Sequence, residues 1–143
     1  MNVIDRNAVA RGATIGLLLF VPIAALRAVV DDNITDFDHS GWAPVFAVAL
    51  LAVYLVAGYV GGREAEAAPY SNGMVAAIGA FLLWIPIRIV IWALRDTSQG
   101  LLTGTTPVFT VPAVFTQLLL AAALGALGGW IAGRRTSVAT PTD

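Results

Sequence analysis

Four long apolar runs alternate with short polar segments along the chain. Each run has about the 20 residues that an α-helix needs to cross the hydrocarbon core of a bilayer. An isolated strand would leave its backbone groups unpaired in lipid, so helices are expected. The pattern therefore predicts an all-α polytopic membrane protein, with one domain over residues 1–143, four transmembrane helices at 12–30, 44–62, 73–95 and 112–133, and a disordered tail at 136–143.

Composition supports a lipid environment and argues against several kinds of partner. Hydrophobic residues make up 58% of the chain and charged residues 12%, with a mean hydropathy of +0.81. A soluble domain usually has about 25% charged residues, so much of this surface is expected to face the lipid bilayer. The net charge of −1 argues against a nucleic-acid partner. The chain has no cysteine, and neither a cofactor nor a metal is expected.

The arginines that flank the apolar runs predict how the chain is oriented in the membrane. Five of them lie on the side of the chain ends: Arg6, Arg11, Arg63, Arg134 and Arg135. The opposite side carries Arg95 and a group of aspartates: Asp31, Asp32, Asp36, Asp38 and Asp96. Because arginine-rich loops stay in the cytoplasm, the prediction is a multi-pass protein of the cell membrane with both termini cytoplasmic.

The two halves of the chain share a layout. Pro22 and Pro86 lie at matching places within IGLLLFVPI and GAFLLWIPI, and each is expected to kink its helix. The second and fourth runs end alike, in GYVGGR and GWIAGR. These matches predict two tandem, similar helical hairpins in repeat units 1–70 and 71–135. The repetition also argues against reading the first run as a cleaved signal peptide.

The glycine-rich ends of the runs carry a resemblance to a known group. The segments GYVGGR and GALGGWIAGRR, with an Asn-Gly pair opening the third run, resemble small four-span prokaryotic integral membrane proteins of unknown function. The resemblance covers most of the second to fourth runs. It implies the four-helix fold and a membrane location, and it carries no catalytic residue to this chain.

Small residues recur every fourth position and so stack on single helix faces. They are Gly12 and Gly16 in the first run, Gly58 and Gly62 in the second, and Ala121, Gly125, Gly129 and Gly133 in the fourth, with Gln117 on the same face. Missing side chains let another backbone approach closely. These candidate packing faces either join the four helices of one chain or form a seam with a second copy or a membrane partner protein.

Arg88 lies within the third run, where a charge in lipid is costly and points to a functional site. Trp84, Arg88 and Trp92 are spaced by four, and Arg95 follows seven residues after Arg88, so they share one helix face. This face is a candidate site for an anionic lipid headgroup or a small anion, which a guanidinium binds through two hydrogen bonds. The alternatives are snorkelling of Arg88 toward the headgroups and a structural ion pair.

No arrangement of residues in the sequence indicates an enzyme. The segment DDNITDFDHS, residues 31–40, holds the single histidine and four aspartates, but it lacks the glycine and glutamate of a calcium loop and is expected to be a solvated loop. The leading hypothesis is a structural or accessory membrane protein that helps assemble a complex through its small-residue faces. The alternative is a small transporter, channel or lipid-handling protein that binds an anionic group near Arg88.

Overall fold

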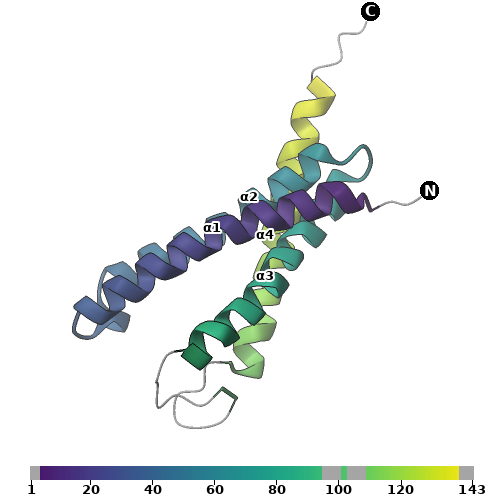
Figure 1. The fold of residues 1–143 in the computed structure, drawn as a ribbon. Helices are drawn as coiled ribbons and strands as arrows, with labels where there is room; N and C mark the ends of the chain where they lie inside the picture. Colours follow the sequence, from purple (N-terminus) through teal and green to yellow (C-terminus); the bar gives the residue numbers. More distant parts are fainter. Residues whose placement is uncertain (1–3, 95–100, 103–108, 139–143) are drawn as a thin grey trace, which may run out of the picture.

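The structure, a computed structural model, describes residues 4–94, 101–102 and 109–138. Its helices are α1 (Arg6–Asn33), the short 3-10 helix η1 (Phe37–His39), α2 (Trp42–Glu64), α3 (Pro69–Leu94) and α4 (Val111–Val138) (Figure 1). All four α-helices are long and apolar enough to cross a membrane. The prediction of an all-α fold with four membrane-spanning helices is therefore confirmed, and the helices indicate a multi-pass protein in a lipid bilayer.

The ends of the helices follow from local chemistry. The Asp5 carboxylate accepts hydrogen bonds from the backbone N–H groups of Asn7 (2.9 Å) and Ala8 (3.2 Å), which caps the start of α1. Pro69 opens α3, where its missing N–H costs nothing because the first turn has no helical acceptor for it. Pro22 and Pro86 lie inside the continuous helices α1 and α3.

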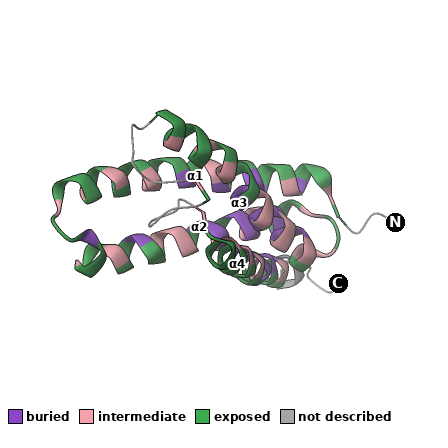
Figure 2. Ribbon diagram, turned by 90° about the horizontal axis from the view of Figure 1, so that it is seen from below, coloured by how far each residue is buried: buried purple, intermediate pink, exposed green. Residues whose placement is uncertain are grey.

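The helices form two antiparallel hairpins, α1–α2 and α3–α4, that cross each other (Figure 1). Helices α2 and α3 pack against each other and against both remaining helices, whereas α1 and α4 flank them. The buried residues gather around the crossing, and the arms beyond it are largely exposed (Figure 2). The start of α1 and the end of α4 lie on one side of the crossing. On the other side the hairpins diverge, and the space between them is called here the opening.

We call the parts of the helices that border the opening the distal halves; they cover 17–33, 42–56, 81–94 and 111–124. Their apolar side chains are widely exposed, including Leu18 (66%), Val48 (66%) and Leu94 (82%). Water would not tolerate so much contiguous apolar surface, whereas lipid chains cover it without cost.

The crossing depends on the predicted small-residue faces, which lie between helices of the same chain. A Cβ atom added to Gly12 would lie 2.6 Å from the Ala57 carbonyl oxygen of α2 and 2.8 Å from the Ala76 Cβ of α3. A Cβ added to Gly58 would meet the backbone of Gly125 in α4. The remaining predicted positions are also packed between helices. Gly16 faces Ala80, Gly62 faces Gly129, and both Gly129 and Gly133 face Pro69. Ala121 is fully buried.

The parallel helices face each other in a constant register. In α1 and α3, Gly12 faces Ala76 and Gly16 faces Ala80, and the rings of Phe20 and Trp84 continue this register with centroids 5.8 Å apart. Pro22 of α1 and Pro86 of α3 are separated by the same number of residues as each of these facing pairs.

The register of α2 and α4 departs from the sequence match. Gly58 faces Gly125, and Gly62 faces Gly129. The match of GYVGGR with GWIAGR instead makes Gly129 the counterpart of Gly58. Helix α4 is therefore displaced by one helical turn relative to the alignment of the two segments.

Asn72 connects two segments through hydrogen bonds, on the side of the molecule where the chain ends lie. Its buried side chain accepts a hydrogen bond from the Asp5 N–H (2.7 Å) and donates to the carbonyls of Ala67 (2.9 Å) and Ala68 (3.1 Å). It thereby fixes both the start of α1 and the connector between α2 and α3. Ala68 in this connector has a φ of 49°, in the left-handed region that L-residues with a Cβ disfavour.

Candidate functional site: an anion site between the hairpins

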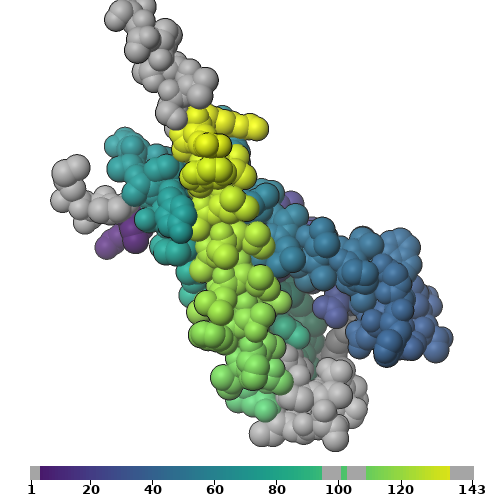
Figure 3. Space-filling model, turned by 180° about the vertical axis from the view of Figure 1, so that it is seen from behind, coloured from purple at the N-terminus to yellow at the C-terminus, as the bar shows by residue number. Residues whose placement is uncertain are grey.

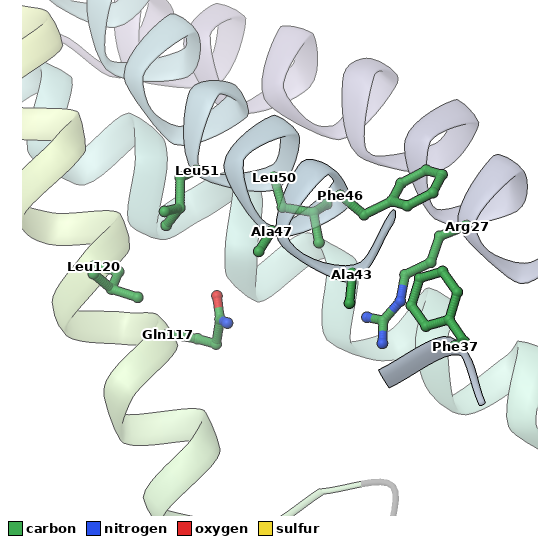
Figure 4. A pocket seen from close by; sticks show the side chains of 9 residues that line it. All are labelled: Arg27, Phe37, Ala43, Phe46, Ala47, Leu50, Leu51, Gln117 and Leu120. Atoms are coloured by element: carbon green, nitrogen blue, oxygen red, sulfur yellow. The ribbon is translucent and has the colours of Figure 1, made fainter. Parts of the chain in front are cut away.

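A cavity of about 250 Å³ lies in the opening, next to the distal ends of α2 and α4. Its walls are mostly apolar and include Phe46, Leu50 and Leu120, while Arg27 and Gln117 supply polar groups. Figure 4 shows the Arg27 guanidinium and the Gln117 amide reaching into this space from opposite sides. The cavity therefore combines an apolar wall with hydrogen-bond donors.

Arg27 comes from α1, six residues before its last residue, Asn33. Its guanidinium lies over the Phe37 ring, 5.5 Å from the ring centroid (Figure 4). Phe37 is itself buried against Phe46, and the Ser40 hydroxyl donates to the Phe37 carbonyl (2.6 Å), so the loop holds this ring in place. The resulting cation–π contact fixes the direction of the guanidinium.

Gln117 is the polar group of α4 in the cavity wall. Its Oε1 accepts a hydrogen bond from the Tyr54 hydroxyl of α2 at 3.0 Å. Tyr54 is buried and packs edge-on against Phe20, with ring centroids 5.2 Å apart. Among the described residues, the Gln117 amide NH₂ has no acceptor, so it can donate to a ligand in the cavity.

Arg88 comes from α3, in the other hairpin. Its guanidinium lies over the Phe109 ring, 5.0 Å from the centroid, and the Phe109 N–H donates to the Leu101 carbonyl (3.0 Å). Trp84, the expected neighbour of Arg88, instead stacks on Phe20 in the core. Trp92 is half-buried in the last turns of α3. The fourth residue of the predicted site, Arg95, lies outside the described residues.

Arg27 and Arg88 lie near the same depth. In the register of α1 and α3, Arg27 is level with residue 91, so Arg88 lies three residues deeper, about 4.5 Å at the helical rise per residue. Two cations from different hairpins thus lie at a similar depth on the distal side of the crossing.

Within the described residues, no carboxylate forms a salt bridge with either of these arginines. The salt bridges described are Arg11 with Glu64 (2.7 Å) and His39 with Asp36 (2.7 Å), both at exposed positions. In this part of the chain Asp31, four residues after Arg27 and a plausible partner by spacing, makes no such bond. Two cations beside apolar helices are unfavourable without a counter-ion, and an anion between them would remove the penalty.

The chemistry of the opening suits an oxyanion. Each guanidinium has five N–H donors in a planar fork that matches phosphate or carboxylate oxygens. The Gln117 amide adds donors from the opposite wall. In the described part of the chain, no group of three or more His, Cys, Asp or Glu side chains is placed to hold a metal ion.

Sequence reasoning identified Arg88 and Gln117 but did not join them to Arg27, Tyr54, Phe37 or Phe109. One signal was available, because each of these arginines lies within a few residues of the polar segment that follows its apolar run. The aromatic partners come from segments between helices, whose placement has no periodic signature. No family model matches the sequence, and no similar curated protein or solved structure is found.

Proposed function

We propose that this protein is a non-enzymatic lipid-handling membrane protein that holds an anionic headgroup between its two hairpins. The observation that carries the proposal is that Arg27 lines the cavity and Arg88 lies at a similar depth in the other hairpin, without a described carboxylate to neutralise either charge. A phosphate group on a lipid supplies the missing charge and accepts hydrogen bonds from both planar guanidinium groups.

The surroundings of the two arginines favour a lipid over a free ion. The cavity wall next to Arg27 is formed by apolar side chains such as Leu50, Leu51 and Leu120. Figure 3 shows that the distal half of α2 and α4 diverge, which supports access to the site from the surrounding bilayer. A molecule with an anionic head and an apolar chain satisfies both parts of this surface, whereas a small anion satisfies only the arginines.

The arginines at the other end of the molecule support an orientation for the site. Arg6, Arg11, Arg63, Arg134 and Arg135 flank the helices on the side of the chain ends, and the positive-inside rule places that side in the cytoplasm. In this orientation the protein resides in the cell membrane, and the opening faces the outer leaflet. Its ligand is then a lipid of that leaflet.

A structural or accessory role in a larger membrane complex is the second candidate. The exposed apolar surface of the distal halves favours it, because helices of a partner protein or a second copy cover such a surface as well as lipid does. The predicted small-residue faces lie between helices of one chain, so a partner would bind through larger side chains.

Lipid retention tests the proposed function. We expect the purified protein, taken from nanodiscs of phosphatidylcholine with phosphatidylglycerol, to retain phosphatidylglycerol in native mass spectrometry. Arg27→Gln and Arg88→Gln should each weaken retention, since a hydrogen bond to a charged group contributes about 1.5–3 kcal/mol, or about 10- to 150-fold in affinity. Arg63→Gln, at an exposed position on the opposite side, is the matched control.

Arg88→Lys separates binding from snorkelling. Lysine keeps the charge but loses the planar fork, so it should restore part of the retention lost in Arg88→Gln. Unchanged phosphatidylglycerol retention in both glutamine variants, with normal folding by circular dichroism, would refute the proposal. A change in oligomer mass in these variants would instead favour the accessory role.

A further inference from the structure

A second surface, separate from the opening, lies on the outer face of the α3–α4 hairpin. It is a shallow apolar groove of about 650 Å³. Its floor is made by Ala122, Ala123 and Ala126 of α4, and Leu119 and Leu127 border it. Figure 3 shows α4, light green to yellow, running along the near face of the molecule.

The groove has the length of a lipid chain in one leaflet. Its lining residues on α4 extend from Leu119 to Trp130, which spans about 16 Å at the helical rise of 1.5 Å per residue. Half of the hydrocarbon core of a bilayer is about 15 Å thick. A single acyl chain laid along α4 therefore fits from the membrane midplane to the headgroup region.

The groove ends in aromatic and cationic groups, on the side of the chain ends. Tyr70 and Trp130 line this end and are half-exposed. The Arg134 guanidinium lies over the Trp130 ring, 4.2 Å from its centroid. Trp and Tyr concentrate at the level of lipid headgroups, and an arginine just beyond them matches the level of the phosphate.

We infer that this groove binds one acyl chain of an anionic phospholipid, whose phosphate is held by Arg134. The lipid belongs to the leaflet on the side of the chain ends, so the site is independent of the proposed function in the opening. A second copy of the chain fits less well. A twofold contact through the groove of parallel molecules would bring two Arg134 side chains to the same end, where their charges repel.

Spin-labelled lipids test this inference. The probe is phosphatidylglycerol with a nitroxide on its acyl chain, added to the full-length protein in phosphatidylcholine vesicles, and electron paramagnetic resonance measures the motionally restricted fraction. We expect Ala123→Phe to fill the groove and remove a restricted lipid. Ala52→Phe, at an exposed position of α2, is the matched control and should leave the fraction unchanged.

Arg134→Gln is a second variant that leaves the alanine floor of the groove unchanged. It should lower the preference for phosphatidylglycerol over phosphatidylcholine by about fivefold, the effect of one cation near a lipid phosphate. All measurements are repeated in an Arg27→Gln, Arg88→Gln background, in which the groove signal should persist. If Ala123→Phe keeps the restricted fraction, or instead dissociates a dimer, the inference is overturned. It also fails if Arg134→Gln leaves the lipid preference unchanged.

Discussion

Replacing Gly73 by alanine tests whether the close crossing of the hairpins holds the fold together. Gly73 lies in the first turns of α3, where it faces two other helices at once. A Cβ atom added there would lie 2.6 Å from the carbonyl oxygens of both Gly58 and Gly125 and 2.8 Å from the Gly129 Cα. All three neighbours are backbone atoms, so no side chain can rotate away to make room.

The expected cost of Gly73→Ala follows from these distances. Ordinary contact with a Cβ begins at 3.4 Å, so the neighbouring backbones must move by 0.8 Å. Such overpacking costs about 1–3 kcal/mol, and the upper value applies because two helices must move. Alanine regains about 1 kcal/mol over glycine in a helix. The net loss of about 2 kcal/mol lowers the ratio of folded to unfolded protein by about 30-fold.

Unfolding in mixed micelles with increasing sodium dodecyl sulfate, followed by circular dichroism, measures this loss. The control is Gly79→Ala in the same helix, where an added Cβ would meet only the Ala13 Cβ at 3.2 Å. We expect Gly79→Ala to unfold at the same or a higher detergent fraction than the wild type. If Gly73→Ala is as stable as Gly79→Ala, the helices do not cross at contact distance and the reasoning is refuted.

Two further substitutions test single contacts by the same titration. Tyr54→Phe removes the hydrogen bond to Gln117, and a double-mutant cycle with Gln117→Leu should give a coupling of about 0.6 kcal/mol; a coupling of zero would show that the bond contributes nothing. Ala68→Gly removes the strain of a left-handed residue with a Cβ atom, which is about 1–2 kcal/mol. The glycine makes the unfolded chain freer, which costs about 0.4–1 kcal/mol of stability. The free energy of unfolding should therefore rise slightly. Ala67→Gly should destabilise, and equal effects of the two glycine substitutions would contradict the assignment of strain to Ala68.

The number and positions of the helices were predictable because lipid imposes a strict rule. A chain that crosses a bilayer must satisfy its backbone within each span, so a run such as 112–133 has one structural solution. The predicted runs lie within the observed helices apart from residue 95, which is not described. The observed helices are longer than the predicted apolar runs because they include flanking polar residues. For example, α3 begins at Pro69, four residues before the run starts at Gly73.

The arrangement of the helices was harder to predict. A small-residue face allows close approach but does not specify which helix approaches, and Gly58 faces Gly125 rather than its sequence counterpart, Gly129. Where the helices cross decides how far apart the distal ends lie, and hence how far Arg27 lies from Arg88. The repeat of the two hairpins and the orientation of the termini stay predictions.

The divergence of the hairpins has a consequence for the membrane itself. The glycine-lined crossing is narrow because the helices touch through their backbones, whereas the distal halves stand apart. The molecule is therefore wedge-shaped and takes up more area in one leaflet than in the other. Lipids adjust to such a shape at modest cost by deforming locally. Many copies inserted in the same direction would then favour a bilayer that bends away from the wide ends.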